Sequence, residues 1–346
     1  MELNEQVLSS LQVSKLFKHN ARPITSISYD DTGTLLVTAS QDEMLRTYSC
    51  TTGKLTNTVK SQKYGCQLAR FAHSNTNILY ASTKQNHDIR YMSSFDNKFI
   101  SYYKGHTAPV RDLQLSPQDD TFISCSMDGS VRMWDLGTSV NAIGIINTQP
   151  NRTPLAEIST QGGGSPVCCA YDQNGLVFAV GVASSSLHMY DARNYKNGPF
   201  DIFRFNQNSR SGGMGEWTRM CFSNDGKYIL VSTSGEYHHL IDSFNGKIVH
   251  SLSGHRGLQV SGVEASFTPD SKFVIAGTAF NQGTHSQDGG VCMWSVNSGR
   301  RVVLDSRNTK GAEWHSDAVR CVAFNPKLCM MASAGTDLAF WTPPNE

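Results

Sequence analysis

The sequence predicts an all-β protein built as a β-propeller of seven blades. Three observations lead to this fold class. One motif recurs along the whole chain, each copy reads as short strands separated by tight turns, and the composition suits a fold of many buried strands. The most complete copy contains, in order, Gly105-His106, Asp128-Gly129 and Trp134-Asp135. This order is that of one blade of a WD-repeat propeller.

The position of Trp134 marks the repeat from one end of the chain to the other. We expect its equivalents at Tyr48, Tyr91, Trp134, Tyr190, Ile241, Trp294 and Trp341. The first intervals match the roughly 40 to 45-residue period of WD repeats, and the later intervals are longer because they contain insertions. The approximate units of this single domain, residues 1–346, are therefore 19–59, 60–103, 104–146, 162–203, 204–250, 251–305 and 312–343.

Within a unit, apolar or β-branched runs alternate with turn residues. In the most complete copy, residues 121–126 and 131–134 read as strands joined by the turn 127–130. Turn signals fall between the first and second strands of four units, at Ser116-Pro117, Asn224-Asp225-Gly226, Thr268-Pro269-Asp270 and Asn325-Pro326. A turn at the same place in several units supports the repeat.

The last unit leaves no room for a fourth strand, because the chain ends shortly after Trp341. The run of residues 11–17 precedes the first unit and has no blade of its own. We expect this N-terminal strand to complete the last blade. Closure of that kind would join the two ends of the ring and cover an exposed strand edge.

Composition and charge argue against several classes of protein. Charged residues are 17% of the chain and there are 29 glycines, which suits buried strands and tight turns better than helices. The apolar runs are far shorter than the roughly 20 residues that span a bilayer, and the N-terminus does not resemble a signal peptide. We therefore expect a soluble intracellular protein with no membrane partner. Lys and Arg total 30 against 29 for Asp and Glu, so we do not expect direct nucleic-acid binding.

The nine cysteines and the adjacent histidines of the chain do not form a metal-binding pattern. No C-x-x-C pair occurs, and most cysteines lie in strand-like runs, where a thiol behaves as a small buried apolar group. Neighbouring strand residues point to opposite faces of a sheet, so a metal site at His238 or His239 would need distant ligands, and the sequence identifies none. We expect no metal and no cofactor.

The polar residues of the repeat are expected to stabilise the blades. In WD repeats a His, a Ser or Thr, an Asp and a Trp form a hydrogen-bonded chain inside the blade. In the most complete copy these residues are His106, Ser126, Asp128 and Trp134. Removing one member would leave the others buried without a partner, which destabilises the fold. We therefore expect no catalytic residue among them.

Other units keep or lose this network to different degrees. The first unit retains His19, Ser40, Asp42 and Tyr48, and the sixth retains His255, Asp288 and Trp294. The second, fourth and fifth units lack the Asp, and the seventh has Gly335 in its place with Asp337 displaced. We expect those four blades to rely on packing.

Eight segments outside the repeat motif resemble one family. They are KYG (63–65), DIRY (88–91), FDNK (95–98), SPQDDTFIS (116–124), NGPF (197–200), EWT (216–218), EASFTPDS (264–271) and AFW (339–341). In this order, from about residue 11 to residue 343, they are similar to the family of WD repeat-containing protein 82. That family supplies the small propeller subunit of COMPASS-type histone methyltransferases.

The resemblance implies a non-catalytic nuclear scaffold or adaptor. Members of the family belong to histone methyltransferase complexes, in which another subunit transfers the methyl group. They also belong to a phosphatase-containing assembly of transcription termination and mRNA 3′-end processing. The implied partners are protein subunits, namely a catalytic histone methyltransferase subunit, a phosphatase-regulatory or 3′-end-processing scaffold, and the phosphorylated tail of RNA polymerase II.

The sequence departs from the family pattern in three segments. They lie near residues 149–164, 206–215 and 280–290 and are rich in polar and turn-forming residues. We expect them to be surface loops.

Partners of a propeller bind the loops around its central axis, and aromatic and Arg side chains are typical anchors. The loops that lead into the first strands carry Arg22, Tyr64 and Trp217, which are the candidate partner-binding residues. The alternative for Tyr64 and Trp217 is a structural role as plugs between blades. Phosphopeptide binding stays open, because a few Arg or Lys side chains suffice to hold a phosphate.

Two other functions stay open. The repeats alone fit equally well a WD-repeat adaptor of an unrelated machine, such as a ubiquitin ligase substrate receptor. A propeller hydrolase is the remote alternative, because no G-x-S-x-G, H-E-x-x-H, P-loop or dinucleotide-binding motif occurs. The family-like segments favour the histone methyltransferase scaffold, which is not an enzyme.

Overall fold

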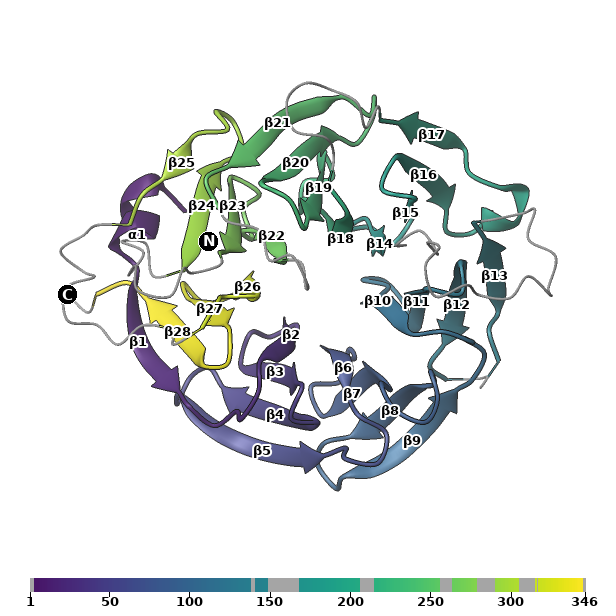
Figure 1. The fold of residues 1–346 in the computed structure, drawn as a ribbon, viewed down its shortest axis with the longest axis horizontal. Coiled ribbons are helices and arrows are strands. Elements are labelled where there is room, and N and C mark those ends of the chain that lie inside the picture. The colour runs from purple at the N-terminus through teal and green to yellow at the C-terminus, as the bar shows by residue number, and fades with distance from the viewer. Residues whose placement is uncertain are drawn as a thin grey trace.

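The computed structural model describes residues 3–137, 141–148, 168–205, 215–255, 263–278, 290–304, 315 and 317–344. In this part of the chain, four-stranded antiparallel sheets stand side by side around a central axis (Figure 1). The predicted all-β propeller of seven blades is confirmed. The predicted loops near 149–164, 206–215 and 280–290 lie outside the described residues, apart from Gly215 and Gly290.

Each of the first six blades is a meander of consecutive strands, and the first strand lies nearest the axis (Figure 1). Blade 1 contains β2 (Ile24–Tyr29), β3 (Leu35–Ser40), β4 (Met44–Ser49) and β5 (Lys54–Lys60). Blade 2 contains β6 (Gln67–Phe71), β7 (Asn77–Ala81), β8 (Ile89–Ser93) and β9 (Lys98–Tyr103). Blade 3 contains β10 (Val110–Leu115), β11 (Thr121–Ser126), β12 (Ser130–Asp135) and β13 (Gly144–Asn147).

The next three blades repeat this order. Blade 4 contains β14 (Cys168–Tyr171), β15 (Val177–Val182), β16 (Ser186–Asp191) and β17 (Asp201–Arg204). Blade 5 contains β18 (Trp217–Phe222), β19 (Tyr228–Thr233), β20 (Tyr237–Asp242) and β21 (Ile248–Ser253). Blade 6 contains β22 (Ala265–Phe267), β23 (Phe273–Gly277), β24 (Val291–Ser295) and β25 (Arg301–Val302).

Blade 7 is assembled from both ends of the chain. It contains β26 (Cys321–Phe324), β27 (Met331–Ala334), β28 (Leu338–Thr342) and, from the N-terminal end, β1 (Gln12–Phe17). Strand β1 runs antiparallel to β28 (purple beside yellow in Figure 1). The predicted closing strand is therefore confirmed. The short helix α1 (Glu5–Ser10) precedes β1 and buries Leu8, and a 3₁₀ turn, η1 (Tyr195–Asn197), lies between β16 and β17.

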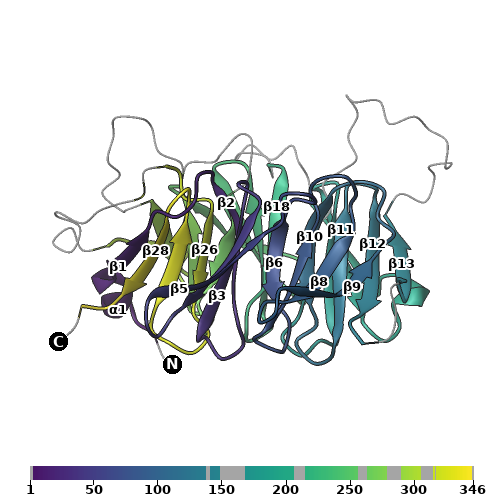
Figure 2. The ribbon, with the colours of Figure 1, turned by 90° about the horizontal axis from the view of Figure 1, so that it is seen from below.

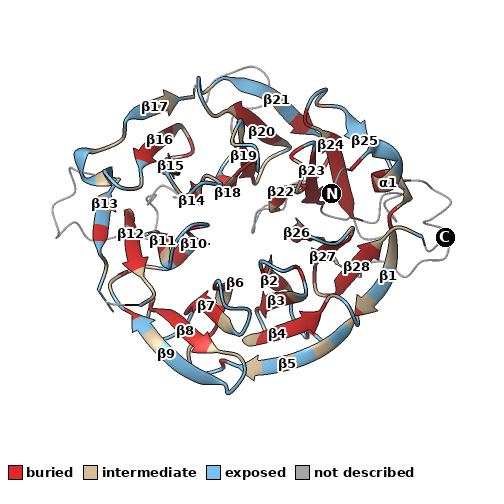
Figure 3. Ribbon diagram, turned by 180° about the vertical axis from the view of Figure 1, so that it is seen from behind, coloured by how far each residue is buried: buried red, intermediate tan, exposed pale blue. Residues whose placement is uncertain are grey.

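The core lies between neighbouring blades, and burial falls from the middle strands to the outer ones (Figure 3). Strand β3 is almost fully buried, whereas β5 alternates between exposed and half-buried residues. The largest side chains of the core are at the repeat positions of the third strands, where Tyr48, Trp134 and Trp341 are fully buried. Burying such side chains is the main stabilising contribution to a fold of this kind.

The expected repeat position in blade 2 is wrong by one residue. Trp134 pairs with Phe122, and in blade 2 the residue in the place of Phe122 is Ile78, which pairs with Met92 and not with Tyr91. Met92 is buried, and a β-bulge separates the two residues where β8 pairs with β9. The sequence was misleading because the aromatic Tyr91 stands next to Met92, which fills the repeat position.

The disc has two faces, which Figure 2 shows edge-on. We call upper the face that carries the loops leading into each first strand, such as residues 61–66, and the turns between second and third strands, such as 127–129. The lower face carries the turns between first and second strands and between third and fourth strands, such as residues 192–200. Antiparallel pairing places these two sets of turns at opposite ends of every blade.

Candidate partner-binding site

A chain of polar side chains runs through blade 3. His106 contacts a carboxylate oxygen of Asp128 through Nδ1 at 2.9 Å and the Ser124 hydroxyl through Nε2 at 2.7 Å. The indole Nε1 of Trp134 donates to the same hydroxyl at 2.8 Å. All four side chains are thus committed to one another inside the blade. They are suited to hold the strands together and are not free to act on a substrate.

The serine of this chain is Ser124, and the predicted Ser126 is wrong. Ser126 donates to the Ala108 carbonyl at 2.8 Å and accepts the backbone N–H of Asp128. Side chains two residues apart point to the same face of a strand, so the sequence offered two serines on the correct face of β11. Pairing decides between them, because the serine that reaches the indole lies two residues beyond Phe122, the partner of Trp134.

Burial and hydrogen bonding fix the charges in this chain. Burial lowers the pKa of His106, and the adjacent Asp128 carboxylate only partly offsets this effect. Burial would raise the pKa of Asp128, but hydrogen bonds from His106 and Ser130 hold it well below its ordinary value. The geometry therefore fits a neutral imidazole that donates from Nδ1 to an ionised carboxylate and accepts at Nε2.

Blade 7 contains the same His–Ser–Trp chain, although its sequence predicted packing alone. His315 Nε2 lies 2.6 Å from the Ser333 hydroxyl, and the Trp341 indole donates to that hydroxyl at 2.7 Å. Ser333 lies two residues beyond Met331, the pairing partner of Trp341. The expectation for blade 7 is therefore corrected. It rested on the missing Asp, whereas the serine position determines whether the chain forms.

Blade 1 replaces the predicted histidine with an arginine. His19 is exposed and only stacks on Tyr48, with ring centroids 6.2 Å apart. The buried Arg46 guanidinium pairs with the Asp42 carboxylate at 2.9 Å, and the Ser40 hydroxyl donates to a backbone carbonyl. The predicted chain of His19, Ser40, Asp42 and Tyr48 therefore does not form, because Arg46 reaches Asp42 from inside the blade.

Blade 6 also differs from the predicted arrangement. The His255 ring stacks on the His238 ring of blade 5 at 3.8 Å between centroids, and both stand edge-on against Trp294. The Trp294 indole donates to the Ser253 carbonyl at 2.8 Å. The predicted Asp288 lies outside the described residues. The place of the bridging serine is taken by Ala276, so the indole bonds to backbone instead.

The three candidate partner-binding residues occupy different environments. Arg22 is exposed on the upper face at the start of blade 1, and Tyr64 is half-buried at the start of blade 2. Trp217 is 2% exposed and packs among the apolar side chains between blades 4 and 5. An added Cβ at Gly181 would meet its ring at 2.7 Å. Trp217 is therefore a structural plug, and Arg22 and Tyr64 remain as candidates.

Tyr64 is oriented by a buried arginine that the sequence did not single out. The Arg90 guanidinium lies 3.5 Å from the centroid of the Tyr64 ring and within 6 Å of the rings of Phe99 and Tyr102. Its Nε donates to the Ser82 hydroxyl at 2.8 Å. Attraction between a cation and these ring faces holds the ring of Tyr64 in place and leaves part of it open to solvent.

An ion pair joins the upper turns of blades 1 and 2 beside Tyr64. The Lys84 ammonium contacts the Glu43 carboxylate, and the Lys63 ammonium lies 5.1 Å from the centroid of the Tyr64 ring. Glu43 has a positive φ of 67°, a backbone conformation that L residues rarely adopt. This corner of the upper face therefore combines charges of both signs, an aromatic ring and the exposed Arg22.

Four charged side chains gather on the inner strands. Arg219 on β18 pairs with Glu264, which precedes β22. Arg70 on β6 and Asp112 on β10 are both buried. Burial, followed by the charge of Arg219, lowers the pKa of Arg70 to about 10. The repeat motif could not reveal this cluster, because none of its four members stands at a His, Ser, Asp or Trp position of the motif.

Some classes of site find no support in the described residues. Within them no group of three or more His, Cys, Asp and Glu side chains could hold a metal ion. Among the same residues, no helix is both long and apolar enough to cross a membrane.

The chain matches a repeat family in four segments and individual relatives over nearly its full length. The family described as "WD domain, G-beta repeat" matches residues 10–49, 97–135, 246–295 and 309–338. WD repeat-containing protein 82 of Drosophila melanogaster is 38% identical over 346 residues, which cover 100% of this chain and 98% of the relative.

Two yeast proteins are similar over nearly the same length. COMPASS component SWD2 of Saccharomyces cerevisiae is 35% identical over 326 residues, 92% of this chain and 90% of the relative. Set1 complex component swd2 of Schizosaccharomyces pombe is 29% identical over 379 residues, 97% of this chain and 98% of the relative. The similarity therefore covers all the blades and not only the repeat motif.

Proposed function

Because the chain belongs to the family of WD repeat-containing protein 82, we propose that it is a non-catalytic scaffold subunit of a nuclear histone methyltransferase complex of the COMPASS or Set1 type. The observation that carries this proposal is the full-length similarity to two relatives whose names place them in such complexes. The blade chains support a scaffold role, because their His, Ser and Trp side chains are bonded to one another.

The proposed mechanism is the docking of short segments of larger proteins on a rigid ring. The upper corner of blades 1 and 2 supports this role, because exposed Arg22 and oriented Tyr64 are of the residue types that anchor interfaces. Packing of Tyr64 against Arg90 fixes the ring before a partner arrives, which lowers the entropy lost on binding. We propose Arg22 and Tyr64 as anchors for a scaffold segment.

We also infer from the family resemblance a place in a phosphatase-containing assembly of transcription termination and mRNA 3′-end processing, and an association with the phosphorylated tail of RNA polymerase II. Arg22 and Lys63 are exposed cations on the upper face, and charge-assisted hydrogen bonds from such groups can hold a phosphate. The adaptor of an unrelated machine remains the alternative function.

Affinity purification of the tagged full-length chain from nuclear extract, followed by mass spectrometry, tests the proposal. We expect a catalytic methyltransferase subunit and 3′-end-processing subunits to be recovered. The double variant Arg22→Glu, Tyr64→Ala should lose part of this set, whereas Phe244→Ser, an exposed change on the lower face, should retain it. Recovery of ubiquitin ligase subunits in place of the methyltransferase would contradict the proposal.

A further inference from the structure

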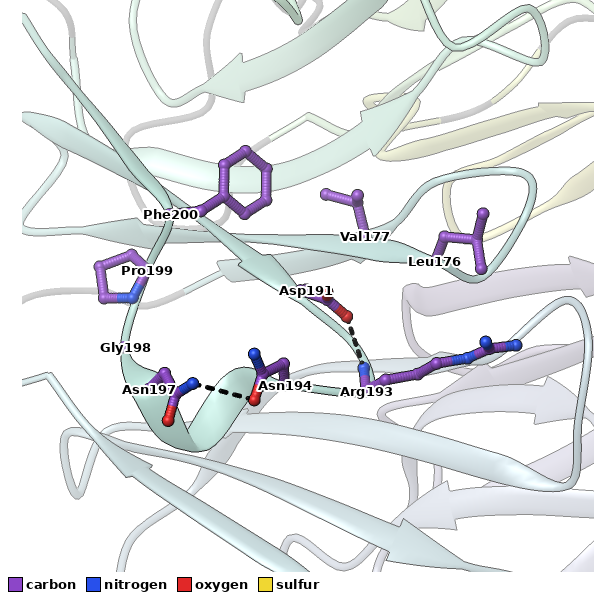
Figure 4. A pocket seen from close by; sticks show the side chains of 9 residues that line it. All are labelled: Leu176, Val177, Asp191, Arg193, Asn194, Asn197, Gly198, Pro199 and Phe200. Atoms are coloured by element: carbon purple, nitrogen blue, oxygen red, sulfur yellow. Dashed lines mark hydrogen bonds between the residues drawn. The ribbon is translucent and has the colours of Figure 1, made fainter.

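We propose that a groove on the lower face of blade 4 binds an extended protein segment in which an apolar side chain stands next to a carboxylate. The groove is a cavity of about 500 Å³ between the start of β15 and the connection from β16 to β17. Figure 4 shows its lining. It lies on the face opposite Arg22 and Tyr64, and the inference goes beyond the proposed function because it does not depend on which complex contains the chain.

The two walls of the groove differ in chemistry. Phe200, Val177 and Leu176 form the apolar wall, and Asn197, Asn194 and Arg193 form the polar wall, with Asp191 between them (Figure 4). Phe200 is 62% exposed and Leu176 is 50% exposed. Exposed apolar side chains beside polar groups are typical of a surface that another protein covers.

The groove continues towards blade 3. A second cavity of about 250 Å³ shares Leu176 and Arg193 with the first and is lined further along by Ile143 and Tyr195. Two neighbouring cavities that share lining residues make an elongated surface site across the junction of two blades. An extended peptide, whose side chains point alternately to two sides, fits such a shape better than a compact small molecule does.

The polar wall is held in place by its own contacts. The Tyr195 hydroxyl donates to the Ile143 carbonyl of blade 3 at 3.0 Å, and the Asn197 amide donates to the Asn194 side chain at 3.0 Å. Gly198 turns the chain with a φ of 88°, a conformation that favours glycine. The groove is therefore formed before any partner binds, which lowers the cost of binding.

The lining of the two cavities holds two carboxylates, Asp191 and Asp119, and one guanidinium, Arg193, and the guanidinium is the group that can bind an acidic occupant. The Asp191 carboxylate accepts the backbone N–H of Arg193 at 2.8 Å, and the Asp119 carboxylate, in the second cavity, is engaged by Thr121. Both acids thus stabilise turns. Arg193 is exposed, and within the described residues its backbone N–H forms a hydrogen bond, whereas its guanidinium forms none. A carboxylate of the occupant can pair with Arg193 in a bidentate manner.

The apolar wall determines which kind of side chain should stand next to the carboxylate of the occupant. An aliphatic or aromatic side chain placed between Phe200 and Leu176 would cover both exposed surfaces, and the amides of Asn194 and Asn197 would face the backbone of the occupant. Exposed Lys196 adds a second cation next to the groove. We therefore assign the groove to segments with Leu, Ile or Phe next to Asp or Glu.

A library of random peptides displayed on phage, selected on the purified full-length chain, tests this inference. We expect the selected sequences to be enriched in an apolar residue adjacent to Asp or Glu. The affinity of the labelled selected peptides is then measured by fluorescence polarisation. Arg193→Glu and Phe200→Ser should each weaken binding by about tenfold or more, as loss of an interface anchor does.

Two control variants separate groove binding from general effects. Phe244→Ser changes a 79% exposed phenylalanine in the corresponding turn of blade 5, and Arg22→Glu reverses a charge on the upper face. Neither should change the affinity. Arg193→Glu alters an exposed side chain and should leave the melting temperature unchanged, so it tests binding even where Phe200→Ser affects folding.

Three results would overturn the inference. They are the absence of any selected binder, selected sequences without acidic residues, and binding that Arg193→Glu leaves unchanged. Because purified protein and synthetic peptides suffice, such a failure leaves the proposed complex membership untouched. Conversely, failure to recover methyltransferase subunits from nuclear extract would leave the groove standing.

Discussion

Blades 3 and 7 contain the same His–Ser–Trp chain but are built differently. Blade 3 is one continuous stretch of sequence, whereas blade 7 joins β26, β27 and β28 to β1 from the other end. In blade 3 a carboxylate contacts His106 directly, and in blade 7 Asp337 acts on His315 through its charge and its backbone. The common element is the serine between the two rings, so the serine defines the chain and the acid only adjusts the histidine.

The largest effect should follow removal of the N-terminal strand, on which blade 7 depends and blade 3 does not. Deleting residues 1–18 removes β1, exposes the edge of β28 and removes the buried side chains of Leu8, Leu11 and Phe17. Each such side chain contributes roughly 1.5–3 kcal/mol when fully buried, so the loss is comparable to the typical total stability of about 5–15 kcal/mol. We expect little soluble folded protein, measured by yield and circular dichroism.

Addition of a peptide that contains residues 1–18 is the matched control for this deletion. If β1 acts by pairing with β28, the peptide should restore part of the folded signal. A truncated chain that melts like the parent without the peptide would show that blade 7 does not need its fourth strand.

The next largest effect should be a difference between His315 and His106 in how they make stability depend on pH. Burial lowers the pKa of His315 to about 4, with Asp337 opposing the effect. The unfolded chain therefore binds a proton between pH 6.5 and 4 that the folded chain does not, and the free energy of unfolding falls as the pH falls through this window. The loss between pH 7 and pH 5 is about 2 kcal/mol for such a group.

Urea unfolding of the parent, His315→Gln and His106→Gln at pH 7 and pH 5 measures this effect. His255 has a pKa lowered to about 4 by burial and serves as an internal reference, since it contributes equally in all three proteins. We expect His315→Gln to reduce the pH dependence more than His106→Gln, because the carboxylate beside His106 opposes the effect of burial. An equal reduction would contradict the assigned role of Asp128.

Serine substitutions should affect the two blades alike. Ser124→Ala and Ser333→Ala each remove the hydroxyl that an indole N–H and an imidazole nitrogen share, which costs about 2 kcal/mol. Ser126→Ala removes a hydroxyl that bonds only to backbone and should cost about 1 kcal/mol. Urea titration at pH 7 measures all three, and a larger loss for Ser126→Ala than for Ser124→Ala would restore the original sequence interpretation.

The blades could be predicted from local periodicity. The closing strand could be predicted because residues 11–17 have no blade of their own and the last unit lacks a fourth strand. The turn signals recur with the repeat, and so does an aromatic residue on the third strand of most blades. Six of the seven expected positions are the ones that pairing selects. Strand register is a different kind of information. Ser124 and Ser126 lie on the same face of β11, and only the pairing with β12 shows which of them meets Trp134.

The candidate site was harder to predict because exposure depends on contacts between blades. Trp217 has the residue type and the loop position of an anchor, yet Gly181 of the neighbouring blade leaves room for its ring inside the core. Arg90 belongs to a third strand and gives no loop signal, yet it orients Tyr64. The groove of blade 4 is formed by the connection from β16 to β17, for which the repeat has no rule.

The smallest expected effect concerns the acid that only blade 3 places against its histidine. Asp128→Ala removes the contact to His106 and the bonds to the N–H groups of Thr107 and Ser130. Water can replace the contact to exposed Thr107, and buried His106 keeps its bond to Ser124, so we expect a loss of about 1 kcal/mol and a lower melting temperature. Asp120→Ala, an exposed change in the same blade, is the control. If Asp128→Ala melts like the parent, the carboxylate has no structural role, and the contrast between blades 3 and 7 reduces to how their strands are joined.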